Sequence, residues 1–468
     1  MDKIKILDQN SDRIFKASAK IRAFLDAIIE PKSLVETDIF LAGKNFADGT
    51  DALGEGVVTG YAVIGDTPVY LFAQNAEVLS GSIGIAGAEK IVKNIYAAKK
   101  AGVPFVSIID SAGARIGEGI GVCEGFAKII KAANDISGSV PHIAVVKGNC
   151  TGLMSAYAGT ADFVFADEKA KISANSPSVV AAVSKGVSAD ALTVKNTAPK
   201  SGAAAYVYKS FDDLKEKLTL LLGLLPSNSS YIAADGYSDD LNRESGELNS
   251  DASFGALVKA AADDGEYFEV YPEFAKEVKC ALGRIAGISV AFTGFDPNEN
   301  KYITLNGLKK LSKFIYTVSG LNIPYIGFVD SKGIEPSLDG EYNGIFEAAS
   351  ELTTNIALSE NVKIAVITGN AIGYAYGALA SKAIGFNYTF ATVNAVVSPI
   401  NPETAVVLIG GDELKKAQDP IAKREELIKK YADESANPYI AAKDGYIDNI
   451  IEPSLIRQYI SSVLTMLV

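Results

Sequence analysis

The residues best suited to chemistry in this chain belong to two glycine-bearing segments, GNCTGL at 148–153 and GNAIGY at 369–374. Each follows an apolar run, at 143–146 or 364–367, and precedes small residues compatible with a helix. The first N–H groups of a helix have no intrahelical partner, and the helix dipole adds partial positive charge there. Each segment is therefore predicted to be a turn that can bind an anion.

Two such turns favour a reaction in which two oxygen atoms become negatively charged. Fixed backbone N–H groups stabilise an oxyanion or enolate by roughly several kcal/mol per site and need no titrating side chain. The single histidine, His142, follows Pro141 at the start of a predicted strand, with no polar motif around it. A mechanism with a histidine base would have to use this residue, and we expect it to be structural instead.

A third polar segment, DSAGARIGEG at 110–119, follows the predicted strand at 105–109. Ligands of open α/β sheets bind at the carboxyl ends of strands, so a loop of small residues there is a candidate site. A tight strand-to-helix connection also needs glycine for its backbone angles. The sequence leaves these two interpretations equal.

Composition argues against several other functions. The formal net charge of -12 disfavours nucleic acid, because binding there depends on neutralising phosphates with Lys and Arg. Cys123, Cys150 and Cys280 are far apart and show no C-x-x-C spacing, so we expect no metal site and no disulfide framework. No apolar run approaches the roughly 20 residues of a spanning helix, and the start lacks a signal-peptide core. We expect a cytoplasmic protein without direct membrane insertion.

Alternating strands and helices must position these segments. The pattern predicts a helical lead-in, a strand hairpin, and then alternating helices and strands. The expected elements of the first half are a helix at 11–29, strands at 57–64 and 69–73, a helix at 86–100, a strand at 105–109 and a helix at 121–134. The second half is expected to repeat this order, with a helix at 308–318, a strand at 325–329 and a helix at 345–358.

The repeat is visible residue by residue. At an offset of 220, nine identities fall within 27 residues, against about two expected by chance, which indicates a duplicated unit. These positions are Gly87, Lys90, Lys93, Ile95, Tyr96, Pro104, Asp110, Ser111 and Gly113. We therefore predict an α/β protein of two homologous domains, 1–235 and 252–468, related by internal duplication and joined by a polar linker.

The ordered motifs resemble the carboxyltransferase subunits of biotin-dependent acyl-CoA carboxylases and decarboxylases. The resemblance rests on DSAGARIGEG at 110–119, SGSVP at 137–141, GNCTG at 148–152, and FVD at 328–330 with Gly333. It extends from about residue 22 to about residue 409. It implies two tandem crotonase-like (ClpP/crotonase) domains, with an active site between the first domain of one subunit and the second domain of another.

The resemblance also implies a reaction and its residues. A carboxyl group would move between carboxybiotin and the α-carbon of a small acyl-CoA, through an enolate held by backbone oxyanion holes. The implied catalytic N–H pairs are Gly152 with Leu153 for the thioester and Tyr374 with Ala375 for biotin. Acyl-CoA binding is implied for Ala112, Gly113, Ala114 and Arg115, and biotin binding for Gly373, Tyr374 and Ala375.

The same resemblance implies the partners. Biotin would arrive on a separate carrier protein, since Met1, Met154 and Met466 are the only methionines and none forms a Met-Lys-Met biotinylation site. Further carboxylase or decarboxylase subunits and a homo-oligomer, a dimer of trimers, are implied, with no metal. The direction of transfer is left open, because one site serves both carboxylation and decarboxylation.

The chain departs from the family pattern at three positions and leaves alternatives open. Leu153 and Tyr374 stand where a second glycine is usual, and Ala112 replaces a loop glycine. A non-catalytic scaffold paralogue and, less favoured, a crotonase-like acyl-CoA hydrolase or isomerase are the alternative functions. Arg115 fits a ligand contact and a structural salt bridge equally.

The remaining side chains near the turns are expected to pack in the core. Tyr157 and Tyr376 follow the two turns at helical spacing, and core packing is favoured for them over stacking on a ligand. Cys150 and Met154 are expected to be packing residues as well.

Overall fold

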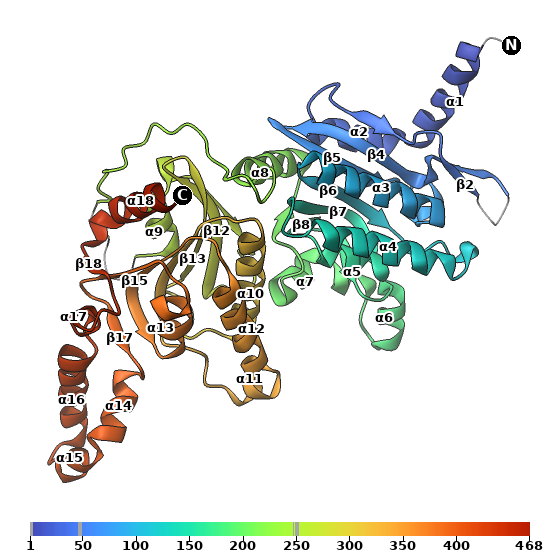
Figure 1. Cartoon of the computed structure of the whole chain (residues 1–468). Coiled ribbons are helices and arrows are strands. Elements are labelled where there is room, and N and C mark those ends of the chain that lie inside the picture. The colour runs from blue at the N-terminus through green and yellow to red at the C-terminus, as the bar shows by residue number, and fades with distance from the viewer. Residues whose placement is uncertain (1–2, 45–48, 247, 249–251) are drawn as a thin grey trace. The chain divides into compact units, whose positions relative to one another are not determined.

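The computed structural model describes residues 3–44, 49–246, 248 and 252–468. Its internal contacts divide the chain into two compact units, Met1–Tyr231 and Ile232–Val468 (Figure 1). Each unit contains an eight-stranded sheet. Across the described ranges, no helix combines the length and the apolar character needed to cross a membrane.

The sheet of the first unit has the order β1-β4-β5-β6-β7-β8-β10, with β9 paired to β7. The pairs β1–β4 and β4–β5 are antiparallel, and the pairs from β5 onward are parallel. The strands are β1 Val35–Thr37, β4 Val57–Ile64, β5 Thr67–Gln74, β6 Phe105–Ser111, β7 His142–Thr151, β8 Phe163–Asp167, β9 Lys171–Ser173 and β10 Tyr206–Tyr208. A separate two-stranded sheet joins β2 Ala42–Lys44 and β3 Asp51–Leu53.

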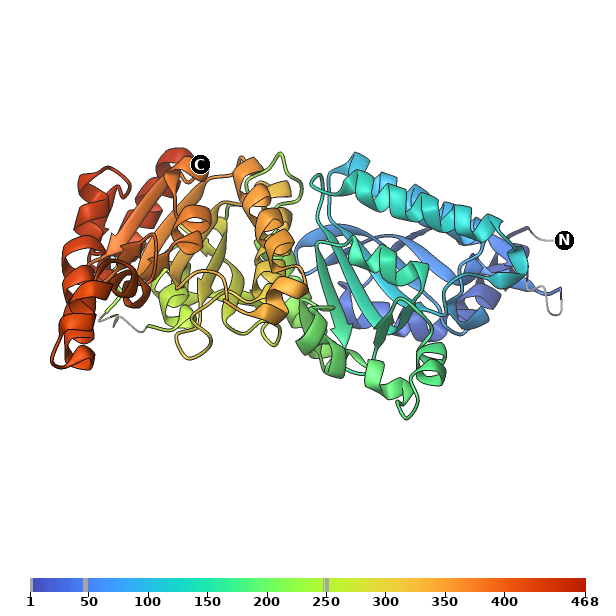
Figure 2. The ribbon, with the colours of Figure 1, turned by 90° about the horizontal axis from the view of Figure 1, so that it is seen from below.

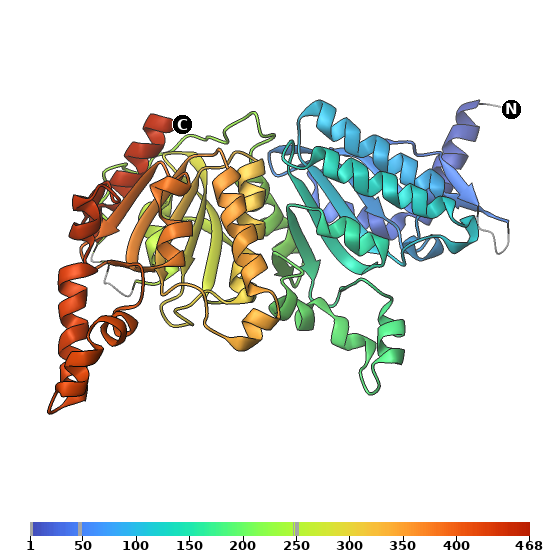
Figure 3. The same ribbon diagram turned by 60° about the horizontal axis from the view of Figure 1, so that its bottom comes forward.

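Helices cover both faces of this sheet. On one face α3 and α4 lie side by side (Figures 2 and 3), and Ile91 and Ile95 of α3 share a core with Phe126 and Ile129 of α4. These residues recur every three or four positions, as a helix with one buried face requires. On the other face α2 packs against α8. The helices are α1 Lys3–Ala17, α2 Ala19–Ile28, α3 Ile85–Ala101, α4 Gly121–Ile136, α5 Leu153–Gly159, α6 Pro177–Val183, α7 Val194–Ser201 and α8 Phe211–Leu224.

The second unit repeats this sheet. Its order is β11-β12-β13-β14-β15-β16-β18, with β17 paired to β15, and its pairs change from antiparallel to parallel after β13. The strands are β11 Tyr267–Val270, β12 Val278–Ile285, β13 Ile288–Phe295, β14 Tyr325–Ser331, β15 Lys363–Ile372, β16 Tyr388–Thr392, β17 Val396–Ser398 and β18 Asn449–Ile451.

The helices of the second unit follow the same plan and add an arm. Helix α10 packs against α12, and α9 packs against α18. Helices α14 to α16 form an arm that projects from the sheet (Figure 3). The helices are α9 Phe254–Ala261, α10 Leu305–Gly320, α11 Leu338–Tyr342, α12 Ile345–Leu358, α13 Tyr374–Leu379, α14 Pro402–Ile409, α15 Gly411–Lys416, α16 Pro420–Ser435, α17 Pro438–Lys443 and α18 Ile456–Leu467.

The two equivalent sheets confirm the predicted α/β fold with duplicated halves. The predicted hairpin is β4–β5, and the helix predicted at 345–358 coincides with α12. The lead-in is two helices rather than one, because α1 ends at Ala17 and α2 begins at Ala19. The Gly-Asn segments also differ from prediction: both lie inside strands, β7 and β15, and the chain turns only at Gly152 and Gly373.

Candidate active site

The first Gly-Asn segment binds a carboxylate that belongs to the protein itself. Asp110, near the end of β6, accepts the Asn149 N–H at 3.1 Å and pairs with Lys147 at 3.0 Å. A Cβ at Gly148 would lie 2.1 Å from an Asp110 carboxylate oxygen, so only glycine leaves room for this contact. The Gly148-Asn149 part of the segment therefore holds an internal carboxylate.

The second unit repeats this arrangement with Asp330. Its Oδ1 accepts the Asn370 N–H at 2.8 Å, and Lys301 lies 3.1 Å from its other oxygen. A Cβ at Gly369 would lie 2.4 Å from the Asp330 carboxylate. We call each aspartate with its Gly-Asn segment a carboxylate clamp. The clamps occupy the Gly-Asn part of each segment, and ligand binding at the turn that follows stays a prediction.

The turns after the clamps begin with glycines in unusual conformations. Gly152 has φ 62° and ψ −134°, and Gly373 has φ 52° and ψ −109°, both outside the range of ordinary L-residues. The Gly152 N–H donates to Ser173 O at 3.1 Å, and the Gly373 N–H donates to Ser398 O at 2.9 Å. Both amides are occupied, so Gly152 is not the free N–H donor that was expected, whereas biotin binding at Gly373 stays a prediction. The backbone conformation of these glycines instead sets the direction in which the following helix starts.

The helices behind these glycines offer the free donors. Helix α5 begins at Leu153, and α13 begins at Tyr374. Among the described residues, the N–H groups of Leu153, Met154, Tyr374 and Ala375 find no acceptor, as expected for a first helical turn. Sequence reasoning missed the Met154 amide, although the repeat offset of 221 aligns Met154 with Ala375.

The loop after β6 adds another free amide beside the first turn. A Cβ at Gly113 would lie 3.6 Å from Thr151 O, which places this loop against the residue before Gly152. Three of its amides are bonded internally: Ala112 to Ser80 O, Gly113 to Ser111 Oγ and Arg115 to Ile83 O. The Ala114 N–H has no acceptor within the described part of the chain. Amides without an acceptor are thus present both in this loop and at the helix start that follows Gly152.

The Arg115 side chain is structural. Its Nη1 contacts Glu55 Oε2 at 2.5 Å and Glu118 Oε1 at 3.1 Å, and its Nη2 donates to Ser82 O at 3.0 Å. Arg115 is 6% exposed and Glu55 is 1% exposed. Burial raises the pKa of the Glu55 carboxyl, although Arg115 opposes this rise. The structure shows the salt-bridge alternative for Arg115, and a contact of Arg115 with acyl-CoA stays a prediction.

The two side chains that replace glycine in the turns behave differently. Leu153 is 41% exposed. The Tyr374 hydroxyl donates to Ala349 O at 2.8 Å and lies 3.0 Å from Thr353 Oγ1, so its ring is anchored on α12. Burial raises the pKa of this hydroxyl, which stays protonated. The backbone amides of both residues have no acceptor among the described residues.

His142 lies in the core of the first unit. Its Nε2 is 2.8 Å from Ser107 Oγ and 3.2 Å from Tyr157 OH, and burial lowers its pKa to about 3. A fully buried neutral imidazole with these partners matches the expected structural role. Tyr157 and Cys150 are also fully buried, in agreement with their expected packing roles.

Tyr376 does not belong to the core, contrary to expectation. It is half-buried, and its hydroxyl donates to Tyr446 O at 3.2 Å. It lines a cavity of about 420 Å³ beside Gly373. The other lining residues are Val397, Ser398, Pro399, Ser435, Ile440, Ala441, Asp444 and Tyr446. The second turn thus opens beside a space with mostly apolar and aromatic walls.

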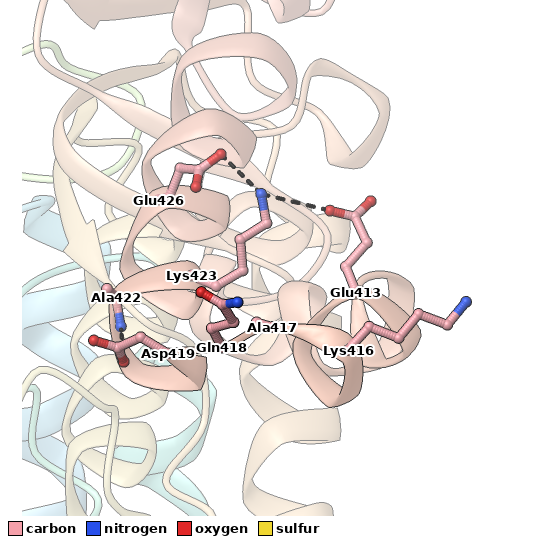
Figure 4. Close-up of a pocket in the computed structure, with 8 residues that line it drawn as sticks. All are labelled: Glu413, Lys416, Ala417, Gln418, Asp419, Ala422, Lys423 and Glu426. Carbon is pink, nitrogen blue, oxygen red and sulfur yellow. Dashed lines mark hydrogen bonds and ion pairs between the residues drawn. The ribbon is translucent and has the colours of Figure 1, made fainter.

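Another cavity, of about 560 Å³, lies on the arm (Figure 4). Its walls are mainly charged, and Lys423 pairs there with Glu426 at 2.9 Å and with Glu413 at 3.8 Å. No residue of either turn lines this cavity. Within the described ranges, no group of three or more His, Cys, Asp or Glu side chains is arranged to hold a metal.

Comparison with known proteins agrees with the fold. A family model, the carboxyl transferase domain, matches residues 16–468. The propionyl-CoA carboxylase carboxyltransferase subunit of Haloferax mediterranei is 31% identical over 97% of this chain and 91% of its own. The methylmalonyl-CoA decarboxylase subunit alpha of Veillonella parvula is 33% identical over 95% and 89%. The transcarboxylase 12S crystal structure, a hexamer with methylmalonyl-coenzyme A and methylmalonic acid bound, has 27% identity and a TM-score of 0.93, covering 99% of this chain and 94% of that one.

Proposed function

The chain belongs to the carboxyl transferase family, and we propose that it moves a carboxyl group between biotin on a separate carrier protein and the α-carbon of a small acyl-CoA. The observation that carries this proposal is the free donor set at the equivalent helix start of both units. The relatives include a carboxylase subunit and a decarboxylase subunit. They support acyl-CoA carboxyl transfer and leave its direction open.

In this proposal the first unit holds the acyl-CoA. The thioester oxygen accepts hydrogen bonds from the Ala114 and Leu153 amides, and Met154 supplies a further free amide at the same helix start. Negative charge grows on that oxygen when the α-carbon loses its carboxyl group or a proton. Amides that are fixed beforehand stabilise this charge without reorganisation, which lowers the barrier. Ala112 and Gly113 shape the loop through their internal hydrogen bonds.

The second unit holds biotin in this proposal. The Tyr374 and Ala375 amides bind the ureido oxygen, and Gly373 directs them. The residues present fit such a group, because the cavity beside Gly373 has the size of typical ligand pockets and an aromatic wall formed by Tyr376 and Tyr446. Bound biotin supplies the ring nitrogen that carries the carboxyl group. The protein orients that ring and stabilises the charge on its oxygen.

The proposed assembly is a homo-oligomer, a dimer of trimers, that works with a biotin carrier protein and further subunits. Exposed apolar side chains on equivalent helices support association, with Val183 at the end of α6 and Leu408 and Ile409 at the end of α14 all more than 70% exposed. Large exposed apolar side chains that cluster favour protein contacts. A cytoplasmic location stays a prediction.

The test uses the purified full chain with free biotin and malonyl-, methylmalonyl- or glutaconyl-CoA. Biotin-dependent loss of the acyl-CoA carboxylate is the expected result. No turnover, together with no acyl-CoA binding in calorimetry, would instead support the scaffold alternative. Release of free CoA without biotin would support the hydrolase alternative.

A further inference from the structure

A lysine and a glutamate pair above the second turn. Lys332 is the first residue after β14, and Glu403 lies in the first turn of α14. Lys332 Nζ is 3.3 Å from Glu403 Oε1, and the two side chains are 31% and 43% exposed. The hydrogen bond of Glu403 to its own backbone and the charges of Lys332 and Arg424 lower the pKa of Glu403, so its carboxylate is ionised at neutral pH.

The sheet order determines where this ion pair lies. Strand β15 is the neighbour of both β14 and β17, and all three are parallel. Their carboxyl ends therefore share one edge, where Lys332 follows β14 and Glu403 stands shortly after β17. An ion pair between these two residues spans the end of β15, where Gly373 starts the turn with the free amides.

The first unit has no counterpart of this lysine. At the offset of 220, Lys332 aligns with Ala112, which has no charge to offer its turn. The rest of the loop is alike in the two units. The N–H groups of Gly113 and Gly333 each donate to the serine hydroxyl two positions earlier. The Gly113 carbonyl accepts the Ile83 N–H, and the Gly333 carbonyl accepts the Ile303 N–H. The cation is thus a specific difference between two otherwise similar donor sites.

We propose that Lys332 determines the specificity of the second site, where its ammonium group binds the carboxylate on the ring of carboxylated biotin and discriminates against biotin whose ring is not carboxylated. This inference rests on the proposed function. An ammonium group has three N–H donors, so it can keep Glu403 and take a second carboxylate. The flexible lysine side chain lets the ammonium group move with the incoming carboxylate. Before the ligand binds, the ion pair with Glu403 keeps that ammonium group near the turn.

Four single variants of the full chain separate this role from a structural one. Lys332→Ala removes the charge, Lys332→Arg keeps it, and Glu403→Gln keeps the lysine while breaking the ion pair. Lys382→Ala is the matched control, because Lys382 pairs with Asp448 at 2.8 Å with similar exposure, 35% and 25%. Those two residues precede β16 and β18, so they lie at the opposite edge of the same sheet.

Two measurements follow each variant. The first is the KM for free carboxybiotin and for the acyl-CoA in the carboxylation direction. The second needs no turnover: the rise in melting temperature that free carboxybiotin or free biotin gives without acyl-CoA, since a ligand stabilises the form that it binds. In the wild type we expect the larger rise with carboxybiotin.

Lys332→Ala is expected to raise the KM for carboxybiotin about tenfold, the effect of losing one charge-assisted hydrogen bond. It should also make the two melting shifts equal, with the KM for acyl-CoA unchanged. Lys332→Arg and Glu403→Gln should keep the preference for carboxybiotin, and Lys382→Ala should match the wild type.

Two results overturn the inference while the proposed function stands. One is a Lys332→Ala variant that behaves like Lys382→Ala. The other is a Glu403→Gln variant as impaired as Lys332→Ala, which would show that the ion pair only anchors α14. If the wild type binds acyl-CoA but transfers no carboxyl group to or from biotin, the proposed function fails and this inference fails with it.

Discussion

Replacing Leu153 with proline would remove one backbone N–H donor and keep helix α5, to which that donor belongs. Leu153 is the first residue of α5, the position where proline is best tolerated because its amide has no intrahelical partner. The residue before a proline favours extended angles. Gly152, with φ 62° and ψ −134°, already has the mirror image of such angles, which glycine adopts without strain.

The size of the effect follows from the number of donors and their surroundings. Leu153→Pro leaves the Ala114 and Met154 amides but removes the one at the tip of the turn. Loss of one donor of this kind costs about 2.7 to 4 kcal/mol in the transition state, or about 10² to 10³ in kcat. Leu153 is 41% exposed. Because water near the site weakens electrostatic interactions, we expect the lower limit, about 100-fold.

The assay compares Leu153→Pro with Leu153→Ala, which loses the same side chain and keeps the amide. Both are measured for biotin-dependent loss of the carboxylate from methylmalonyl-CoA, with circular dichroism and melting temperature as controls for folding. In the second unit, Tyr374→Pro against Tyr374→Ala makes the same comparison. A Leu153→Pro variant that folds normally and keeps a kcat within threefold of Leu153→Ala would refute the assignment of this amide.

Three further predictions concern the supporting structure. Since His142 titrates near 6.5 when unfolded and near 3 when folded, its contribution to stability is complete above pH 6.5 and is lost as the pH falls below that value. Lowering the pH from 7.5 to 5.5 should cost the wild type about 1.4 kcal/mol more than His142→Gln in urea unfolding. Gly148→Ala forces a methyl group to within 2.1 Å of a carboxylate oxygen and should lower the free energy of unfolding by about 1 to 3 kcal/mol. Gly159→Ala is the control, because its added methyl group would have no atom within 4 Å. Equal melting temperatures for the two variants would contradict the clamp. Arg115→Met leaves the carboxylate of Glu55 buried and unpaired and should lower the free energy of unfolding by about 3 to 5 kcal/mol. The double variant with Glu55→Gln should recover much of this loss. A double variant no more stable than the single one would count against this pairing.

The fold was largely predictable because its periodic patterns are strong. Helices α10 and α12 each bury one face, and the parallel strands are short continuous apolar runs, so period and length identified them. The repeat at offset 220 then predicted two similar halves. These signals are local or internal to the chain, which is why a single sequence was sufficient.

The site was less predictable because its contacts join residues distant in sequence. Arg115 meets Glu55 across 60 positions, and no local pattern points from one to the other. The occupied Gly152 amide depends on the pairing of β9 with β7, which places Ser173 beside it. The predicted Gly152 donor is therefore occupied, and ligand binding at the two turns stays a prediction.

The carboxylate clamps also bear on the history of the chain. Asp110 with Asn149 and Asp330 with Asn370 make the same contact in both units, so the simplest account places it in a single-unit ancestor. Such an ancestor would have needed two copies of itself to present two turns, as a homodimer does. Fusion of two gene copies then freed each half to change alone, and Lys332 opposite Ala112 is a difference that a homodimer could not keep on one side.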